Sequence, residues 1–374
     1  MSIWIADNNQ LKNLCDQLAH CDLIAIDTEF IRTNTFYPKL ALIQLSDGKN
    51  IWLIDVLAIE DFLPLKKLLE SPDKTLIFHA CAEDLEALDH SVNIQPTHIF
   101  DTQIAAGIVN IGYCMGYARL VGSLLDIQLD KQETRSDWLA RPLTKRQLQY
   151  AEVDVLHLHR LHSILVKMLN EQKRTEWFEE ESKGLFSVVD QRKNNEDYYS
   201  RIKGVWRLNP QSLTALRRLC QWRDSISRSK DIPKSRIAKD NVLLEVAKQM
   251  PKYHHQLHSI SGLHPSTIRR YGELILNEIE ISRHQDQDVW APMPLSGRLV
   301  VILKNIRQSL ATVAKQQKIP KEFLLNKREL EDILRSSQQG NYQLPDRVKQ
   351  GWRQQWVQSV IESELSKANL ICET

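Results

Sequence analysis

Two carboxylates stand two residues apart at the end of an apolar run. The run at residues 23–26 is typical of a buried β-strand and leads directly to Asp27 and Glu29. In a strand, residues i and i+2 point to the same side, so the two negative charges lie next to each other. Burying such a pair is costly unless a cation neutralises it, and Mg²⁺ or Mn²⁺ is the kind of ion that carboxylate oxygens prefer. On this fragment alone, a turn cap at Asp27 and a solvated charge at Glu29 explain the pattern equally well.

Three further polar side chains stand where a sheet and its helices can converge. Asp84 follows the predicted strand at residues 75–80. Asp154 lies four residues after Tyr150 on a predicted helix, so these two residues share one helix face. Taken singly, Asp84 is typical of a helix cap and Asp154 of a surface acid. Together with the first pair of acids, they form a combination that is hard to obtain by chance and that favours a divalent-metal site.

The elements that must position these residues alternate between strands and helices. The patterns predict strands at residues 23–30, 41–46, 51–56, 75–80 and 98–101, and helices near 61–69 and from about 83, 102 and 117. The turn at residues 47–50 joins two strands as an antiparallel meander. The later alternation predicts an α/β domain with a mixed sheet.

A capping box marks the helix that carries the last acid. Thr144 is followed three residues later by Gln147, and an apolar stripe continues from Leu148 to Leu165. We therefore predict one long helix that begins just after Thr144.

Length and composition favour a multidomain protein with a charged partner. A chain of 374 residues is long enough for two or three domains. Residues 208–374 hold 26 basic and 17 acidic side chains, whereas residues 1–207 hold 23 and 30. This asymmetry favours a polyanionic substrate, although solvated surface would also account for it. Six cysteines without metal-ligand spacing, no signal peptide and no apolar run of roughly 20 residues predict a cytoplasmic protein.

The second half of the chain is predicted to be helical and repeated. Residues 232–234 (Ile-Pro-Lys) recur at residues 319–321, which favours two copies of one small helical unit. A basic run could follow a phosphate backbone. It comprises Arg217, Arg218, Arg223, Arg228, Lys230, Lys234, Arg236 and Lys239.

Three short stretches carry a family resemblance. Residues 26–30 (IDTEF), 79–84 (HACAED) and 150–154 (YAEVD) resemble the three motifs of the DEDD superfamily of exonucleases, in the subclass with Tyr in the third motif. The longer stretches at residues 27–45, 100–106 and 116–155 resemble bacterial ribonuclease D, and residues 208–285 resemble its first HRDC domain. Residues 295–374 are a weaker match to a second one.

The resemblance implies an architecture and an activity. It implies a ribonuclease H-like exonuclease domain at residues 1–170, a connecting segment at 171–207, an HRDC domain at 208–290 and an HRDC-like domain at 295–374. The expected activity is 3′→5′ exoribonuclease hydrolysis with two divalent ions, Mg²⁺ or Mn²⁺, that releases 5′-mononucleotides. The expected substrates are tRNA precursors and other small structured RNAs, and the expected oligomeric state is a monomer.

The resemblance also implies residue roles. Asp27 would contact both metals, Glu29 and Asp154 would complete one metal site, and Asp84 would support the second. Tyr150 would orient the attacking water, because a phenol with a pKa near 10 is a poor base at neutral pH. Weaker expectations concern contacts with the substrate. Gln44 and His79 could touch the terminal nucleotide, but a core or structural role explains them at least as well. Lys131, Arg135 and Arg141 could contact phosphate, and a solvated loop face explains them equally well.

Two other readings remain open from the sequence. A DNA exonuclease of the proofreading or helicase-associated type would use the same acids. Distinguishing RNA from DNA requires recognition of the 2′-OH, and no residue in the sequence indicates such recognition. The second alternative is a non-catalytic scaffold that binds nucleic acid. A scaffold, however, has no chemical need for four clustered acids.

Overall fold

The computed structural model describes residues 2–129, 136–193, 196–338 and 342–370. The chain forms two compact units. The first comprises Met1–Ile31, Leu40–Val189 and Leu295–Thr374, and the second comprises Arg32–Lys39 and Asp190–Pro294. The short segment Arg32–Lys39 thus belongs with helices that lie far from it in sequence.

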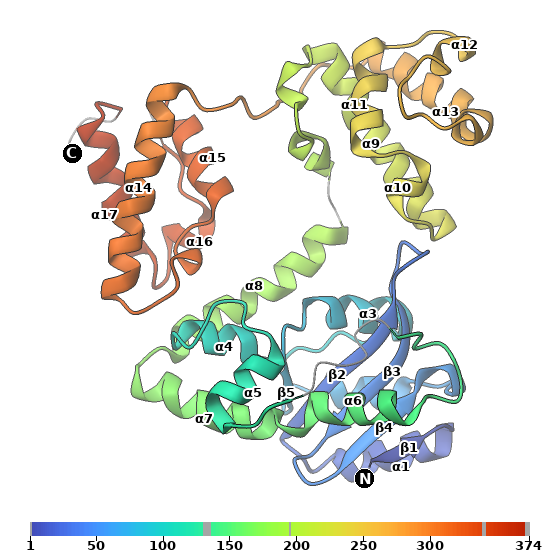
Figure 1. The fold of residues 1–374 in the computed structure, drawn as a ribbon, viewed down its shortest axis with the longest axis vertical. Helices are drawn as coiled ribbons and strands as arrows, with labels where there is room; N and C mark the ends of the chain where they lie inside the picture. The colour runs from blue at the N-terminus through green and yellow to red at the C-terminus, as the bar shows by residue number, and fades with distance from the viewer. Residues whose placement is uncertain (1, 130–135, 194–195, 339–341, 371–374) are drawn as a thin grey trace. The chain divides into compact units, whose positions relative to one another are not determined.

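A six-stranded mixed sheet forms the centre of the first unit (Figure 1). Its strands are β1 (Ile3–Ile5), β2 (Leu23–Ile31), β3 (Lys39–Ser46), β4 (Ile51–Asp55), β5 (Thr75–Phe78) and β6 (Ile99–Asp101). Their order is β1-β4-β3-β2-β5-β6. β3 and β4 pair antiparallel, as the predicted meander requires, while β1–β4, β2–β5 and β5–β6 pair parallel. The predicted mixed sheet is confirmed.

Alternation along β2 separates the two faces of the sheet. Ile24 and Ile26 are fully buried on the face that is covered by α1, α2 and α3, whereas Ala25 lies on the opposite face in a cluster with side chains of α4 to α7. Asp27 and Glu29 have the parity of Ala25 and therefore point to that opposite face. The helices of these layers are α1 (Asn8–Leu18), α2 (Leu63–Leu69), α3 (Ala82–Val92), α4 (Thr102–Ile108), α5 (Tyr117–Leu125), α6 (Lys145–Leu156) and α7 (Leu158–Glu171). Figure 1 shows α6 lying across the strands.

The predicted long helix is two helices in the structure. The capping box at its start is confirmed, because Thr144 Oγ1 accepts from the Gln147 amide at 3.2 Å and the Gln147 side chain accepts from the Thr144 amide at 3.0 Å. The helix breaks at His157, however. Tyr117 Oη donates to Val153 O at 2.8 Å and accepts from the His157 amide at 3.2 Å. A distant hydroxyl therefore takes both partners of one helical hydrogen bond, which local sequence patterns cannot reveal.

The first strand and helix were not predicted from the sequence. β1 is only three residues long, and its Ile3 and Trp4 are exposed, so it lacks the apolar alternation of a half-buried strand. It pairs parallel to β4 in the register Ile3 with Trp52. Pairing with a strand about 50 positions later, rather than any local pattern, makes this segment a strand.

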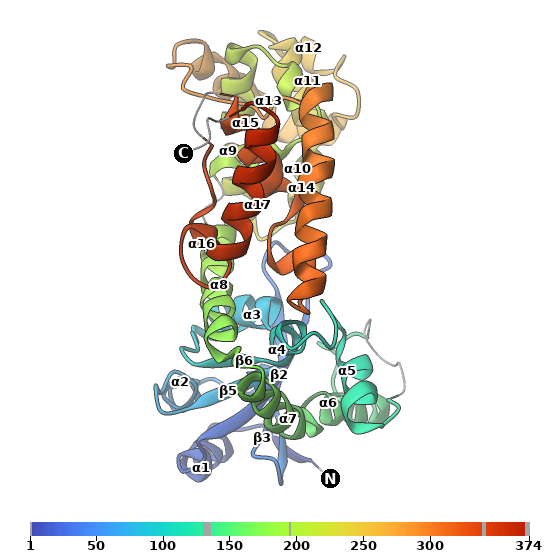
Figure 2. The ribbon, with the colours of Figure 1, turned by 90° about the vertical axis from the view of Figure 1, so that its left-hand side faces the viewer.

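The C-terminal residues of the first unit form a helical layer that packs on α8 (Thr175–Lys193). Its helices are α14 (Gly297–Gln316), α15 (Lys327–Ser337), α16 (Asp346–Lys349) and α17 (Gln354–Lys367), and α14 and α17 run side by side in both views (Figure 2). Trp177 of α8 stacks on Trp352 with ring centroids 4.6 Å apart. Arg353, which is almost fully buried, pairs with Glu180 at 2.7 Å. The acidic cluster in the predicted connecting segment thus holds the C-terminal helices.

The second unit is a helical bundle with the segment Arg32–Lys39 attached. Its helices are α9 (Pro210–Lys230), α10 (Lys234–Ile237), α11 (Asp240–Gln249), α12 (His254–Leu257) and α13 (Pro265–Arg283). Single turns of 3₁₀ helix occur at η1 (Val56–Ala58), η3 (Val205–Arg207) and η4 (Lys321–Phe323), and a longer one at η2 (Glu196–Arg201). The absence of strands after residue 208 is as predicted, for the residues that the structure covers.

Hydropathy and cysteine chemistry add two observations about the described part of the chain. Within it, no helix combines the length and the apolar character that crossing a bilayer requires. Cys15, Cys21, Cys81, Cys114 and Cys220 are all free thiols.

Arg141 ties the segment ahead of α6 to the sheet. Its Nε and Nη2 donate to the two carboxylate oxygens of Asp55 at 2.9 and 2.6 Å, and Nη2 also donates to Ala41 O at 2.8 Å. Its Nη1 donates to the carbonyl oxygens of Trp138 and Ala140 at 2.7 and 2.8 Å. All five donors are engaged, so none is left for a phosphate, contrary to the expectation from the sequence.

We expect Arg141→Ala to lower the free energy of unfolding by about 3 kcal/mol, because it leaves the carboxylate of Asp55 buried without its partner. Urea denaturation followed by circular dichroism measures the change. The control is Arg146→Ala, since Arg146 is exposed on α6 and its removal should cost less than about 0.5 kcal/mol. Equal losses for the two variants would contradict the structural role of Arg141.

Candidate active site

Three of the predicted acids meet at one point on the sheet. Carboxylate oxygens of Asp27, Glu29 and Asp154 all lie within 4.8 Å of one another, and each residue remains partly exposed to solvent. β2 supplies the first two and α6 supplies the third. Oδ2 of Asp154 is buried and has no hydrogen-bond partner among the described residues. Three converging carboxylates with an unpartnered oxygen fit a hard divalent cation.

Burial and mutual repulsion both raise the pKa values of these acids, and burial is the larger cause. Burial, followed by the charges of Asp84, Asp154 and Glu29, raises the pKa of Asp27 well above its usual value. Burial, followed by the charges of Asp154 and Asp84, raises the pKa of Glu29 to about 9, and burial raises that of Asp154 to about 7. Protons and metal ions therefore compete for the same oxygens.

Asp84 stands outside this closest group but interacts with it. It lies in the first turn of α3, and its charge is the largest neighbouring-charge contribution to the raised pKa of Asp27. Burial raises the pKa of Asp84 itself to about 7, while a hydrogen bond from Thr28 opposes the rise. The Thr28 hydroxyl donates to Asp84 Oδ1 at 2.5 Å, and both residues are buried. The structure thus brings all four predicted acids into one electrostatic group.

Tyr150 lies beside the group, one turn before Asp154. Its hydroxyl donates a hydrogen bond to the Asp154 carboxylate, and its ring lies 6.1 Å from the ring of Trp138. Burial and the three nearest acids raise the pKa of Tyr150. The phenol therefore remains protonated at neutral pH and can donate a hydrogen bond, but it cannot accept a proton as a base.

Asp101 is a buried acid whose role the sequence reasoning missed. Its carboxylate accepts from the amides of Ala80 at 3.1 Å and Cys81 at 2.9 Å, and also caps the N-terminus of α4. Ala80 has a left-handed backbone with φ of 62°, so the turn that leads into α3 needs such support. Asp101 thereby positions the helix that carries Asp84. Its place just before a predicted helix was the available signal.

Comparison with known proteins agrees with this geometry. The model of the 3′-5′ exonuclease family matches residues 2–170, and the model of the HRDC domain matches residues 212–279. The chain is 36% identical over 369 residues to ribonuclease D of Pseudomonas paraeruginosa, with 98% of each chain covered. It is 33% identical over 361 residues to ribonuclease D of Escherichia coli, with 93% of this chain and 94% of that one covered. The chain belongs to the ribonuclease D family.

A solved structure from the same family supports the assignment over nearly the whole chain. The crystal structure of Escherichia coli RNase D superposes with a TM-score of 0.87 at 31% identity, covering 98% of this chain and 99% of that one. As a member of the ribonuclease D family, the protein is a 3′-5′ exoribonuclease that uses divalent metal. The resemblance that was read from the three motifs is thereby confirmed.

The structure describes two of the four remaining residues that were predicted to contact the substrate. Gln44 is fully buried opposite Leu53 on the face that α6 covers, and neither atom of its side-chain amide has a partner among the described residues. His79 Nδ1 lies 2.9 Å from Thr102 Oγ1, and burial lowers the pKa of His79. Lys131 and Arg135 lie outside the described residues. Contact of these four side chains with a nucleotide stays a prediction.

Much of the basic run is engaged with acids of its own domain, the first helical domain, which comprises the helices α9 to α13 of the second unit. Arg218 pairs with Glu278 at 2.7 Å, and Arg223 pairs with Asp240 at 2.7 Å. Asp224 pairs with two further members of the run, Arg228 and Lys234. The run therefore offers fewer free cations to a phosphate backbone than the sequence count indicated.

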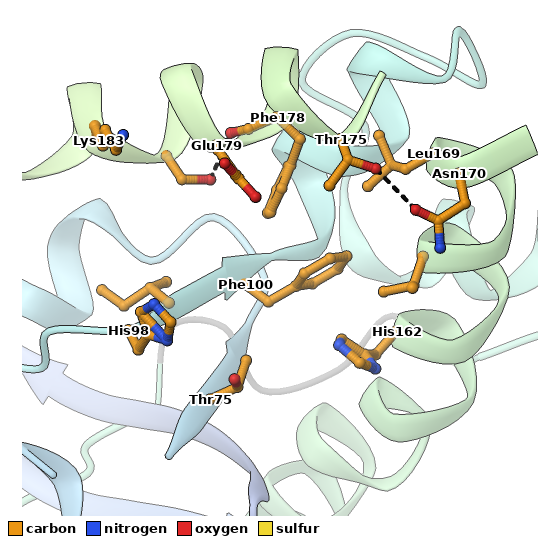
Figure 3. Close-up of a pocket in the computed structure, with 13 residues that line it drawn as sticks. Thr75, His98, Phe100, His162, Leu169, Asn170, Thr175, Phe178, Glu179 and Lys183 are labelled. Carbon is orange, nitrogen blue, oxygen red and sulfur yellow. Dashed lines mark hydrogen bonds between the residues drawn. The ribbon is translucent and has the colours of Figure 1, made fainter. Parts of the chain in front are cut away.

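A pocket of about 530 Å³ lies elsewhere in the first unit, between β6, α7 and α8 (Figure 3). Figure 3 shows Phe100 and Phe178 on its walls, and the Thr175 hydroxyl donates to Asn170 Oδ1 at 2.9 Å at its rim. None of the four acids lines it. It is therefore separate from the candidate active site.

We expect Thr28→Val to weaken Mn²⁺ binding and to slow hydrolysis by about 10–100-fold, because removal of a hydrogen bond to a metal-binding carboxylate typically has an effect of that size. Isothermal titration with Mn²⁺ and single-turnover kinetics measure the two effects. Thr28→Ser keeps the hydroxyl and should restore both. An equally impaired serine variant would show that the hydrogen bond to Asp84 is unimportant.

Proposed function

We propose that the protein removes nucleotides one at a time from RNA 3′ ends by two-metal hydrolysis, releases 5′-mononucleotides and matures tRNA precursors and other small structured RNAs. The convergence of carboxylate oxygens of Asp27, Glu29 and Asp154 within 4.8 Å, with Asp84 coupled to them, is the observation that carries this proposal. The Escherichia coli relative, described as an exoribonuclease involved in structured RNA processing, supports the substrate class.

Each residue of the group has a proposed task. Asp27 would hold both cations, Glu29 and Asp154 would complete one site, and Asp84, oriented by Thr28, would support the other. When bound, Mg²⁺ or Mn²⁺ ions would neutralise the scissile phosphate, lower the pKa of the attacking water and stabilise the leaving 3′ oxygen. Tyr150, which stays protonated, would donate a hydrogen bond that orients this water.

The raised pKa values indicate that the active form of the site is the one in which the acids are deprotonated. Because protonated carboxyl groups bind cations poorly, the acids must lose their protons before the site can bind metal. Activity at fixed metal concentration should therefore rise with pH through the range in which these acids titrate. The proposed cellular setting is the cytoplasm, where free thiols such as the five that the structure describes stay reduced.

The test uses the full-length protein and a 5′-labelled RNA hairpin with a single-stranded 3′ tail. With Mg²⁺ or Mn²⁺, we expect stepwise shortening from the 3′ end and 5′-mononucleotides on thin-layer chromatography. A DNA hairpin of the same sequence tests the DNA exonuclease reading, and faster hydrolysis of DNA would favour it. Binding of RNA without cleavage at any metal concentration would favour the scaffold reading. Light scattering during gel filtration tests the proposed monomer.

A further inference from the structure

The loop that follows β2, the strand of Asp27 and Glu29, is held by the first helical domain. Arg32–Lys39, which joins β2 to β3, forms one compact unit with Asp190–Pro294. Within this unit, Oδ1 of Asp231 accepts hydrogen bonds from the backbone amides of Phe36 and Tyr37, each at 3.0 Å. A carboxylate that binds two successive amides is a strong and directional anchor.

The ring of Phe36 is held by the same helices. Arg228 Cζ lies 4.9 Å and Lys234 Nζ lies 5.6 Å from the ring centroid, within the range of cation–π attraction. Both cations also pair with Asp224, which keeps them in place. The Arg236 guanidinium donates to the side chain of Asn34 as well.

The loop also supports its own conformation. Arg32 Nε donates to Phe36 O at 2.9 Å, and Thr35 Oγ1 donates to Tyr37 O at 2.6 Å. These local bonds leave the Phe36 and Tyr37 amides for Asp231. The loop is therefore shaped to present two donors and one aromatic ring to α9 and the residues that follow it.

The position of this loop in the chain links it to the active site. Arg32 is three residues after Glu29, so its Cα can lie no more than about 10 Å from that of the metal-binding residue. A group that binds the Glu29 carboxylate therefore lies close in the chain to the start of this loop. The acids themselves lie outside the loop, on β2, α3 and α6.

We propose that Asp231 is a positioning residue for the exonuclease reaction, which holds the 32–38 loop in the conformation that seats the 3′-terminal nucleotide. This inference rests on the proposed function. It gives the first helical domain a task in the hydrolysis of substrates too short to be gripped by it.

Asp231 allows a sharply matched pair of variants. Its backbone is left-handed, with φ of 47°, a conformation that glycine and asparagine both tolerate. Asp231→Gly removes the side-chain acceptor without straining the backbone, and Asp231→Asn keeps an acceptor oxygen at the same place. A difference between them therefore reports on the hydrogen bonds to the loop.

The first measurement is hydrogen exchange of the full-length protein without RNA. Mass spectrometry of peptides that cover residues 33–38 should show at least about tenfold faster exchange in Asp231→Gly, because two amides lose a charged acceptor. Asp231→Asn should stay within about threefold of wild type, since a neutral oxygen remains in place. Phe36→Leu, which keeps an apolar side chain but loses the ring, should change exchange in the same direction by a smaller factor.

The second measurement is steady-state hydrolysis of an RNA trinucleotide with Mn²⁺. We expect Asp231→Gly to raise KM by about tenfold with kcat within about threefold, and Asp231→Asn to restore KM, because the loop seats the nucleotide and the sheet holds the acids. Faster exchange in Asp231→Gly with an unchanged KM would overturn the inference, and so would unchanged exchange. If wild-type protein shortens neither the trinucleotide nor the RNA hairpin with a 3′ tail, the proposed function fails and this inference falls with it. If it shortens the hairpin alone, KM and kcat of the variants are measured on the hairpin, and the same outcomes decide the inference.

Discussion

Replacing Asp27 by Asn is expected to lower the rate of RNA hydrolysis by at least about 10³-fold, which corresponds to about 4 kcal/mol of lost transition-state stabilisation. The charges of Asp84, Asp154 and Glu29 all act on Asp27. An amide of the same shape removes the charge that both cations are proposed to share. Single-turnover kinetics on a 5′-labelled RNA measure the loss.

The control for this prediction lies on the helix that carries another of the acids. The Glu152 carboxylate accepts from the Ser2 hydroxyl at 2.6 Å and is absent from the acidic cluster, so Glu152→Gln should keep its hydrogen bond and near wild-type activity. RNA binding by Asp27→Asn, measured by fluorescence anisotropy, should remain within a few-fold of wild type. Hydrolysis by Asp27→Asn at the wild-type rate would remove the basis of the proposed mechanism.

The metal-free protein is expected to lose stability as the pH rises, and divalent metal should reverse the loss. The folded state raises the pKa of Asp84 and Asp154 to about 7 and that of Glu29 to about 9, from ordinary values of 3.8 and 4.5. The folded protein therefore binds more protons than the unfolded chain between pH values of about 4 and 9, and stability falls through this window. Thermal unfolding with EDTA, monitored between pH 5 and 9 by circular dichroism, measures the slope.

One substitution should oppose this loss without any metal. Because Asp27→Asn removes one of the mutually repelling charges, it should raise the Tm of the metal-free protein near pH 8 by about 4–8 °C, which corresponds to roughly 2 kcal/mol. Mn²⁺ should raise the Tm of wild type more at pH 8 than at pH 5, and should raise that of Asp27→Asn much less. A wild-type Tm that rises with pH in EDTA would show that the acids do not repel one another as the structure indicates.

The fold of the exonuclease domain was predictable wherever local patterns are strong. Runs such as that of β3 are apolar and bounded by turn residues, and the Thr144–Gln147 capping box marks the start of α6 by local hydrogen bonds. The strand β1 and the break at His157 were missed, because each depends on a partner far away in sequence. Contacts with residues far away in sequence produce no periodic pattern of apolar residues in the segment itself.

The residues of the site were predictable from the sequence, but the hydrogen bonds and ion pairs that hold them in place were not. The four acids and Tyr150 stand in short motifs, so their chemistry is legible in the chain. The hydrogen bond from Thr28 to Asp84 and the engagement of all five Arg141 donors appear only in three dimensions. The sequence shows how many charged residues are present, but only the folded structure shows which of them are paired with one another.

The sequence by itself determined the family, the chemistry and most of the strands and helices from β2 onward in the exonuclease domain, because these depend on residue type and on spacing along the chain. Only the tertiary structure decided which oxygens meet, which arginines are already engaged and which helices hold the loop after Glu29. The physical reason is that pKa shifts, ion pairs and buried hydrogen bonds depend on distances in space. The chain brings these distances about through contacts between segments that are remote in sequence.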